Sequence, residues 1–559
     1  MHSTVLAQKH DRDFPAEKFK TKGEVYFTFQ INGKSDLEKL TRIISLDNVQ
    51  GNQVFAYANE QEFKNFLRLG YTYQILTHPG DLLDESQLRS TGAGEGILTT
   101  WDFYPSYDQY INYMNEFVVN YPEICKLVFI GYSILGRELI AVKISDNVNE
   151  EEAEPQLLYT SSMHGNETTG YPTMLHLIDY LLSNYGTDPR VTGMVDHTEI
   201  FINPLANPDG TYWTGNSSVY GAIRYNANFV DLNRNYPDPE DGPHPDGNEW
   251  QAETSAFMDF AEDNHFVLSA NFHGGAEVVN YPWDTWAQLA ADDDWWQYVS
   301  HEYADTAHTF SPPGYMSGFN NGITNGYEWY EINGGRQDYM NYFHFCREVT
   351  IEISNASLLP ASQLLNHWEY NYRSLLNYIE QAGFGLQGIV TDSVTGEPLQ
   401  AVVFIPSHDT NNSQVYTKLP SGYYSRLLNE GQYDIQFAAS GYFPKIISGV
   451  NVVNRTTTSL DVQLVPTNIG LEEQRNERIT MAYPNPSDGH IRLVLPETGI
   501  TQAQVECYSM KGVRVFNKSL YVPESEMSVK MDLSHLAGGL YLLRLSTNTA
   551  NYTDRIIIR

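Results

Sequence analysis

Apolar and polar positions alternate in two rhythms near the N-terminus of the chain. Runs with a period of two indicate strands, and apolar residues spaced three or four apart indicate helices. The expected strands cover residues 24–29, 53–57 and 71–76, and the expected helices cover residues 34–44 and 60–69. These strand–helix units predict a small α+β module over residues 24–90, which could serve as a prodomain or as an accessory domain.

The same two patterns continue over a much longer stretch, from residue 100 to residue 382. The expected helices cover residues 107–121, 171–182, 251–264, 295–310 and 362–382, and the expected strands cover residues 127–130, 139–144, 157–159, 199–203, 267–272 and 347–354. Strands and helices that alternate in this way build sheets covered by helices. We therefore expect an α/β fold with a mixed central sheet flanked by helices.

Short period-2 runs separated by turn residues fill the rest of the chain. They predict two C-terminal β-sandwich modules, over residues 385–466 and 479–559. The glycine-rich stretch 92–96 and the polar stretch 472–478 are expected to be linkers. Residues 1–23 are expected to form an N-terminal tail, and we interpret its Val5-Leu6-Ala7-Gln8 as the remnant of a signal peptide.

Composition and charge narrow the possible partners. The 559 residues exceed what one core can hold, and Asp plus Glu (69) outnumber Lys plus Arg (34), which gives a net charge of −35. Such a field repels nucleic acid and anionic membranes, and it either attracts cationic ligands or simply keeps the protein soluble. No apolar run is long enough to span a membrane. The three cysteines cannot all pair, and whether Cys125 pairs with Cys346 stays open, as does calcium binding by the acidic loops 238–246 and 292–294.

Candidate chemistry begins where one expected strand passes into a helix. His164 and Glu167 lie in the loop after the strand 157–159, and α/β sheets bind their ligands at such strand ends. An imidazole and a carboxylate can hold Zn²⁺ if a third protein ligand is present. His273 ends the strand 267–272 at the same predicted sheet edge, followed by two glycines. The three residues therefore predict a zinc site.

Three further loops and strands supply charged groups. Asn233 and Arg234 stand side by side, and Arg224 lies seven positions before Asp231. A guanidinium can bind a carboxylate through two hydrogen bonds, and a second one can stabilise an oxyanion. Glu352 is embedded in an apolar strand, where an unpaired charge is unfavourable unless it has a chemical role, such as taking a proton from water beside a metal.

In this order, the motifs resemble those of the zinc metallocarboxypeptidases, and most closely the regulatory branch that includes carboxypeptidases N, E, D and M. The shared phrases are His-Gly-Asn-Glu from His164, Asn-Pro-Asp-Gly from Asn207, Asp-Leu-Asn-Arg-Asn-Tyr-Pro from Asp231, His-Gly-Gly from His273 and Asn-Gly-Ile-Thr-Asn-Gly from Asn321. The resemblance covers residues 100–382. It implies that His164, Glu167 and His273 bind one zinc ion.

The resemblance also implies roles for the other residues. Glu352 would act as general base and then as proton donor, and Arg224 would polarise the scissile carbonyl. Asn233 and Arg234 would hold the free C-terminal carboxylate of the substrate, and Tyr330 would close over it. A clamp on that carboxylate makes an exopeptidase, because it positions the last peptide bond.

Specificity is implied by two more positions. Asp284 lies eleven residues after His273, where the regulatory branch places the acid of the pocket for the released residue, and Gln337 matches its partner. A buried carboxylate favours Lys or Arg. Arg336 stands where the branch usually has Met, and a cation there would weaken this preference unless it pairs with an acid elsewhere.

The flanking modules resemble known companions of such enzymes and of exported proteins. Residues 385–466 resemble a transthyretin-like domain, and residues 479–559, with Tyr483-Pro484-Asn485-Pro486 and Gly538-Gly539-Leu540-Tyr541, resemble a type IX secretion sorting domain. The latter implies the secretion machinery as a partner and a secreted or surface protein.

We therefore expect a secreted zinc carboxypeptidase that removes C-terminal Lys or Arg from peptides or proteins. One alternative is hydrolysis of another C-terminal amide, such as that of a cell-wall peptide. Another is a peptide-binding pseudoenzyme, but such proteins lose a metal ligand or the general base, and here all four residues are present.

Overall fold

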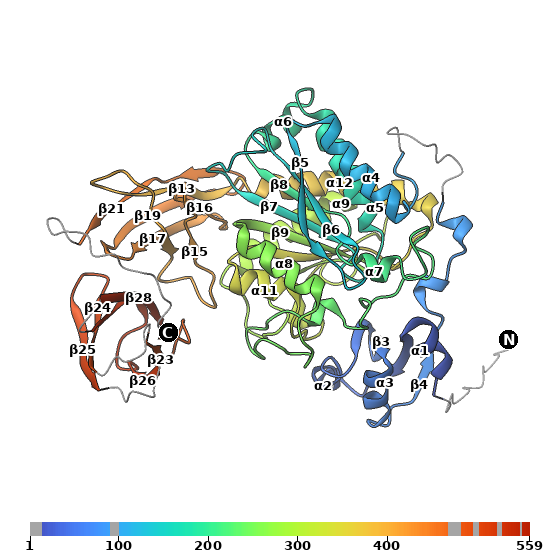
Figure 1. Cartoon of the computed structure of the whole chain (residues 1–559), viewed down its shortest axis with the longest axis horizontal. Coiled ribbons are helices and arrows are strands. Elements are labelled where there is room, and N and C mark those ends of the chain that lie inside the picture. The colour runs from blue at the N-terminus through green and yellow to red at the C-terminus, as the bar shows by residue number, and fades with distance from the viewer. Residues whose placement is uncertain (1–13, 90–99, 468–481, 496–501, 522–527, 548–550) are drawn as a thin grey trace. The chain divides into compact units, whose positions relative to one another are not determined.

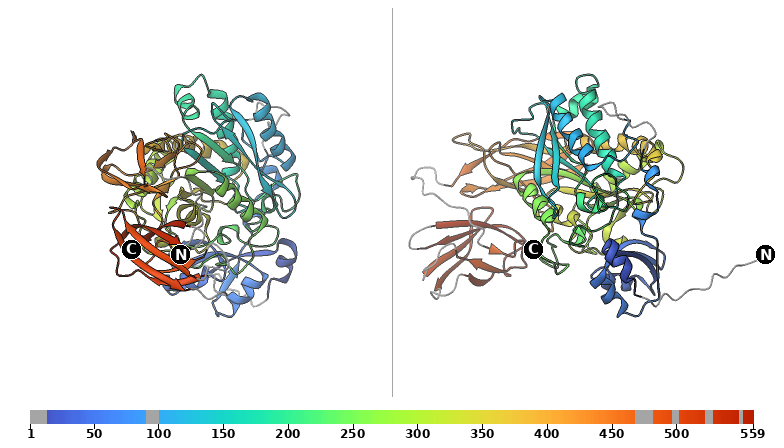
Figure 2. Two further views of the ribbon diagram at one scale, coloured as in Figure 1. Left: turned by 60° about the vertical axis from the view of Figure 1, so that its left-hand side comes forward. Right: turned by 45° about the vertical axis from the view of Figure 1, so that its right-hand side comes forward.

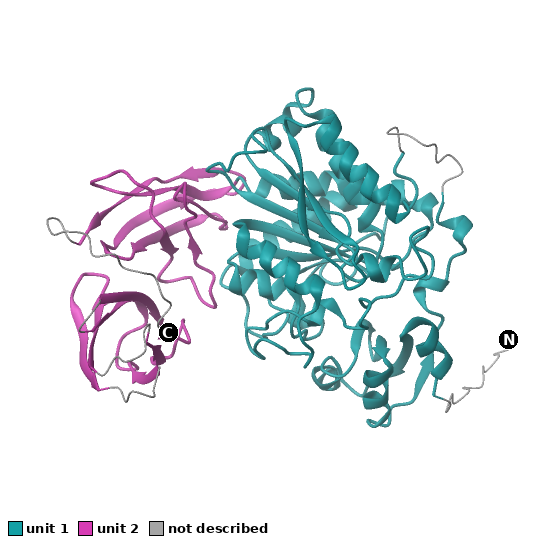
Figure 3. Ribbon diagram, in the orientation of Figure 1, with its two compact units in different colours: residues 1–383 teal, residues 384–559 magenta. Residues whose placement is uncertain are grey.

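A computed structural model describes residues 14–89, 100–467, 482–495, 502–521, 528–547 and 551–559. The chain forms two compact units, residues 1–383 and 384–559 (Figure 3). The proposed signal remnant and the two expected linkers lie outside the described residues. Within them, no helix is both long and apolar enough to cross a membrane, and Cys125, Cys346 and Cys507 are buried free thiols.

The N-terminal module is a four-stranded antiparallel sheet, in the order β2-β3-β1-β4, with helices packed on it (Figure 1). Phe27, Phe29, Phe63 and Phe66 lie in its fully buried core. The strands are β1 (Glu24–Gln30), β2 (Ser45–Gln50), β3 (Gln53–Asn59) and β4 (Tyr73–Ile75), and the helices are α1 (Ala16–Lys22), α2 (Leu37–Leu40) and α3 (Glu60–Leu67).

Two expectations for this module need correction. Residues 16–22 are not a tail but helix α1, because Phe19 packs into the module's core. The expected helix over 34–44 is a 3₁₀ turn (Lys34–Asp36) followed by the four-residue α2, and strand β2 starts at Ser45. The sequence concealed β2, because a bulge between Leu46 and Asn48 interrupts its period of two.

The large domain is built on an eight-stranded mixed sheet in the order β11-β10-β12-β9-β7-β8-β6-β5, which confirms the expected fold class. Its strands are β5 (Cys125–Tyr132), β6 (Glu138–Ile144), β7 (Gln156–Ser161), β8 (Glu199–Asn203), β9 (Phe266–His273), β10 (Ala276–Tyr281), β11 (Ile323–Asn325) and β12 (Arg347–Ser354). Strands β8, β7, β9 and β12 run parallel to one another, and β5 and β6 pair antiparallel with their neighbours. Strand β10 pairs antiparallel with β12 and parallel with β11.

Helices cover both faces of this sheet. Tyr159 of β7 hydrogen-bonds the helix α12, while the adjacent Leu158 shares a buried cluster with Phe257 of α8 and Tyr339 of α11. Adjacent strand residues point to opposite faces, so α12 and the α8–α11 pair lie on opposite sides. The helices are α4 (Tyr107–Asn120), α5 (Gly170–Asn184), α6 (Pro189–Val195), α7 (Pro208–Thr211), α8 (Ala252–Asp263), α9 (Asp293–Thr309), α10 (Gly326–Trp329), α11 (Arg336–Phe343) and α12 (Leu364–Gln381).

Parallel pairing brings three functional segments to one edge of the sheet. Ser161, the last residue of β7, is opposite Phe272 of β9, and His273 is opposite Glu352 of β12. The loop that carries His164 and Glu167 therefore leaves the sheet beside His273 and Glu352.

The second unit consists of two β modules, and Figure 2 shows strands without helices in its described parts. The first has a five-stranded and a four-stranded sheet around one core, with β13 (Gly385–Asp392), β14 (Ala401–Phe404), β15 (Val415–Tyr416), β16 (Tyr423–Arg426), β17 (Gly431–Ala439), β18 (Tyr442–Phe443), β19 (Lys445–Val452), β20 (Thr457–Ser459) and β21 (Val462–Pro466). The second has a three-stranded and a four-stranded sheet, with β22 (Ala482–Tyr483), β23 (His490–Val494), β24 (Gln502–Ser509), β25 (Arg514–Tyr521), β26 (Ser528–Asp532), β27 (Gly539–Ser546) and β28 (Asn551–Ile558).

Candidate active site

The three expected metal ligands meet at one buried point. His164 Nδ1 lies 2.9 Å from Glu167 Oε1 and 3.1 Å from His273 Nδ1, and His273 Nδ1 lies 2.8 Å from Glu167 Oε2. At most 3% of any of these residues is exposed. Two imidazoles and a carboxylate crowded together suit a single cation, since the ligand atoms of tetrahedral Zn²⁺ are roughly 3.3 Å apart. The residues present therefore fit a zinc ion.

Neighbouring polar groups orient both histidines. Asp231 Oδ1 lies 3.0 Å from His164 Nε2, and the Asn271 amide lies 2.9 Å from His273 Nε2. A second partner on the far ring nitrogen fixes the orientation of a metal-binding imidazole. The sequence had placed Asp231 in a motif without giving it a role. Its position two residues before Asn233 was the only signal available.

Glu352 reaches the same space from β12. One of its carboxylate oxygens, Oε2, is buried and has no hydrogen-bond partner. Burial raises the pKa of Glu352 well above its usual value, and the nearby negative charges of Glu167 and Asp47 act in the same direction. An acid that readily holds a proton beside a metal site has the property required of a general base that later donates the proton.

Two arginines line the same cavity as the metal ligands. Arg224 Nη1 donates to Glu167 Oε1 at 2.8 Å, and its Nε lies 3.3 Å from Asp231 Oδ2. Arg234 differs: its Nη1 donates to the Asn233 carbonyl at 2.8 Å, while its Nε and Nη2 are buried without a partner. Buried guanidinium N–H groups are normally paired, so Arg234 offers unused donors to a ligand.

Asp284 lines the same cavity. It is 2% exposed, and its Oδ1 accepts hydrogen bonds from Asn280 at 3.0 Å and from Gln337 at 3.1 Å. Burial raises the pKa of Asp284 to about 6. Arg336 does not reach this pocket, because its guanidinium pairs with Glu348 at 3.0 Å in the buried layer beside β12.

In the acidic loops considered for calcium, Asp238 and Asp292 are engaged by other groups of the protein. Asp238 accepts hydrogen bonds from the backbone N–H groups of Glu240, Asp241 and Gly334. Asp292 forms a 2.6 Å ion pair with Arg347. These contacts give both acids a structural role.

The expected site residues therefore converge. One cavity is lined by His164, Glu167, Arg224, Asn233, Arg234, His273, Asp284, Tyr330 and Glu352, and Gln337 contacts it through Asp284. The sequence did not reveal that strand β2 of the N-terminal module also lines this cavity. Ser45 Oγ accepts a hydrogen bond from Arg224 Nε at 2.8 Å, Asp47 lies 3.5 Å from Arg224 Nη1, and the Leu46 carbonyl accepts one from Tyr330 at 3.3 Å.

Known proteins with similar sequences are carboxypeptidases, and a zinc carboxypeptidase family model matches the chain, which agrees with a metal site at these residues. Residues 110–374 match the family model described as zinc carboxypeptidase. Carboxypeptidase M of Mus musculus is 36% identical over 59% of this chain and 76% of its own length, and the carboxypeptidase N catalytic chain of Rattus norvegicus is 34% identical over 64% and 85%. The chain belongs to the zinc carboxypeptidase family. Zinc is the metal of this family, and His164, Glu167 and His273 form a site that suits it.

Three further proteins are similar to this chain, but either the match covers a smaller part of the relative or the sequence identity is lower. Carboxypeptidase D of Anas platyrhynchos is 38% identical over 65% of this chain. The chain spans only about a quarter (26%) of that relative's length. Solved structures of carboxypeptidase A from Helicoverpa armigera and of thrombin activatable fibrinolysis inhibitor superpose with TM-scores of 0.52 and 0.50. They cover 65% and 64% of this chain and 98% and 99% of their own. At 18% and 16% identity, they show the fold alone.

The C-terminal residues of the chain match a second family model. Residues 481–559 match the model described as a secretion system C-terminal sorting domain. This confirms the expected sorting domain, and the protein is exported, either secreted or held at the cell surface. The transthyretin-like character of residues 385–466 stays a prediction.

Proposed function

We propose that this protein is an exported metallocarboxypeptidase that hydrolyses the last peptide bond of peptides or proteins and releases Lys or Arg. The observation that carries the proposal is Arg234, whose Nε and Nη2 are buried without a partner in the cavity of the metal ligands. A substrate carboxylate accepts both N–H groups at once. Asn233 and Tyr330 line the same cavity and would complete the clamp.

The reaction that we propose uses Glu352 and Arg224 around the held peptide bond. Zinc bound by His164, Glu167 and His273 supplies a Lewis acid that lowers the pKa of water. Glu352 accepts a proton from the attacking water and delivers it to the leaving amine. Arg224 donates to the carbonyl oxygen as negative charge develops on it.

Asp284 supports the preference for basic residues. Its carboxylate is nearly fully buried, and the nearby cation that would oppose this preference, Arg336, is paired with Glu348. An ammonium or guanidinium entering the pocket would therefore meet an unneutralised acid. Hydrolysis of another C-terminal amide would not need this acid, and a pseudoenzyme would not need Glu352.

With the N-terminal module cut away, we expect the enzyme to release Arg and Lys from acyl-dipeptides far faster than Phe, and a zinc chelator to abolish the release. In Asp284→Ala, kcat/KM for Arg should fall about 100-fold, because a charge-assisted hydrogen bond contributes up to roughly 3 kcal/mol, while the slow release of Phe should not fall. The assay compares paired dipeptides that differ only in the last residue.

Asp305→Ala is the matched control, since it removes one carboxylate from the exposed face of α9 and leaves the pocket intact. Preferential release of Phe by the protein without substitutions, again with the N-terminal module cut away, would keep the enzyme class and refute the role of Asp284. No release of any residue, with zinc bound and the N-terminal module cut away, would favour a peptide-binding pseudoenzyme.

We further propose that the N-terminal module is an inhibitory prodomain. With the module in place, the catalytic cavity retains a space of about 20 Å³, which holds about one water and no amino-acid side chain. Ser45 and Asp47 contact Arg224, the group that would bind the oxyanion. Trp329, Tyr330 and Ile332 share one apolar cluster with the module's core, so the contact is held by buried surface as well.

Cutting the chain between the module and the large domain is expected to raise kcat/KM at least tenfold. The rise should be seen only when the cut protein is diluted so far that the module dissociates. A protease recognition sequence in place of residues 92–96 would allow the cut. Before the cut, the tether holds the module at an effective concentration in the millimolar range; after it, nanomolar protein should lose the module and micromolar protein should keep it. Activity per mole is measured across that dilution series.

The uncut protein, diluted in parallel, is the control and should stay inactive at every concentration. Equal activity of cut and uncut protein throughout the series would show that the module does not inhibit. That result would leave the assignment of the catalytic residues untouched.

A further inference from the structure

A second cavity opens between helices α4 and α5 of the large domain. Its space is about 270 Å³, and it is lined by Trp101, Tyr113, Glu116, Phe117, Asn120, Tyr121 and Asp179. None of these residues lines the zinc site. Asp179 lies nine residues beyond Gly170, the first residue of α5, and therefore roughly 13 Å along that helix from its start. The cleft is thus a separate place on the same domain.

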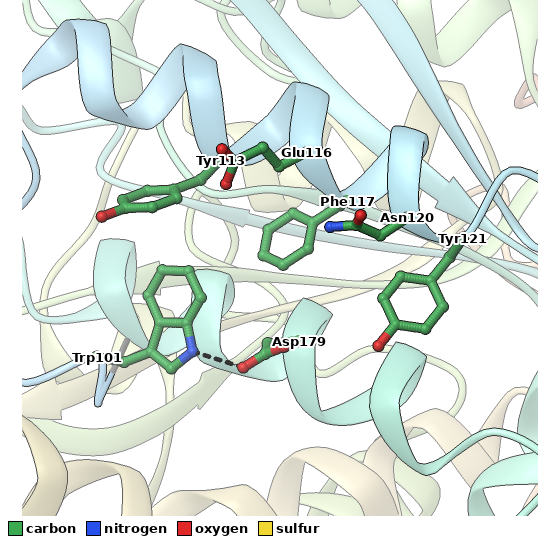
Figure 4. Close-up of a pocket in the computed structure, with 7 residues that line it drawn as sticks. All are labelled: Trp101, Tyr113, Glu116, Phe117, Asn120, Tyr121 and Asp179. Atoms are coloured by element: carbon green, nitrogen blue, oxygen red, sulfur yellow. Dashed lines mark hydrogen bonds between the residues drawn. The ribbon is translucent and has the colours of Figure 1, made fainter. Parts of the chain in front are cut away.

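The walls of the cleft are aromatic and are held in place. Figure 4 shows the Trp101 indole beside Tyr113 and Phe117 of α4, with its N–H directed at Asp179 of α5. The indole Nε1 donates to Asp179 Oδ2 at 2.8 Å, and the Trp101 ring packs edge-on against Tyr113 at 5.4 Å between centroids. The hydrogen bond fixes both the ring and the carboxylate.

The charges of the cleft are uncompensated. Glu116 and Asp179 are both half-buried, and no Lys, Arg or His within the described ranges pairs with either carboxylate. Burial raises the pKa of Asp179, and only the Trp101 hydrogen bond opposes it. His176, which lies beside Trp101, is not a competing cation, since burial lowers its pKa to about 4.

We propose that this cleft binds the cationic side chain of an arginine or lysine within a peptide, at a site distinct from the catalytic pocket. Aromatic faces and a desolvated carboxylate together select organic cations. The space of about 270 Å³ lies just below the usual range of drug-sized pockets, so it suits one long side chain and not a folded segment. The net charge of −35 would bring such basic peptides to the surface.

The test uses a ligand that cannot occupy the catalytic clamp. Nα-acetyl-arginine methylamide has the guanidinium but no free carboxylate, and its citrulline analogue is a neutral isostere. Saturation-transfer NMR on the intact protein should give a Kd on the order of 1 mM for the arginine compound, as expected for about fifteen ligand atoms. The citrulline compound should bind at least tenfold more weakly.

Asp179→Asn is expected to weaken the arginine compound about tenfold, and Glu116→Gln severalfold. Asparagine still accepts the Trp101 hydrogen bond, so the wall of the cleft is kept. Asp305→Ala and Asp284→Ala should leave binding unchanged, which separates the cleft from general charge and from the catalytic pocket. Equal binding of arginine and citrulline, or unchanged binding by Asp179→Asn, would overturn the proposal. Because the readout is binding, it does not depend on the proposed enzymatic activity.

Discussion

Glu352→Gln should lower kcat by about 10³- to 10⁴-fold with little change in KM. A positioned acid–base group contributes up to roughly this factor, and glutamine cannot carry the proton from water to the leaving amine. The amide has nearly the same shape as the carboxyl group, so the clamp formed by Arg234 should still bind the substrate. The measurement is steady-state hydrolysis of an acyl-dipeptide ending in Arg, with the N-terminal module released and the zinc content determined.

Glu348 offers a matched control on the same strand. Each of the two carboxylates has one buried oxygen without a hydrogen-bond partner, but Glu348 Oε2 pairs with Arg336, whereas Glu352 lines the cavity of the metal ligands. Glu348→Gln should therefore lower the melting temperature, since it leaves a buried charge without its partner, and should keep most of kcat per folded molecule. Glu352→Gln should instead keep the melting temperature and lose most of kcat. A Glu352→Gln protein that binds zinc and stays within tenfold of the parent kcat would exclude Glu352 as the base.

The meeting of the candidate site residues could be predicted from the sequence because parallel strands bring their ends to one edge. His164, His273 and Glu352 each belong to a strand or strand end that the apolar pattern identified, and β7, β9 and β12 are neighbours in the sheet. Residue type and strand position were then enough to bring these groups together. The partner of Arg336 could not be found in this way, since it depends on how α11 packs against β12.

The residues that the N-terminal module contributes to the cavity could not be predicted either, because they too depend on how distant parts of the chain pack together. Strands β1, β3 and β4 and the core follow from local pattern, but strand β2 and the face that the module turns to the large domain do not. Asp47 lies in β2, where a bulge hides the strand period, and its contact with Arg224 spans 177 positions of the chain. The sequence thus indicated a possible prodomain and gave no sign of which residues enter the site.

Replacing Arg234 by methionine should reduce kcat/KM about 10³- to 10⁴-fold for substrates with a free C-terminal carboxylate. A site built to hydrogen-bond one substrate group loses this much when the pairing is removed, because the remaining polar group is left unmatched. Arg234→Lys should recover part of the loss, since lysine keeps the charge but not the two parallel N–H groups. The assay compares each acyl-dipeptide with its C-terminal amide.

The comparison with the amide separates a clamp from a general effect on folding. For the parent enzyme, the amide should already be a poor substrate, and Arg234→Met should hardly worsen it. Since Nε and Nη2 of Arg234 have no partner in the protein, methionine removes an unsatisfied buried cation, and the melting temperature should stay equal or rise. Equal losses for acid and amide would mean that Arg234 acts on the reacting bond and not on the carboxylate. Specificity for chain ends would then have to come from Asn233 and Tyr330.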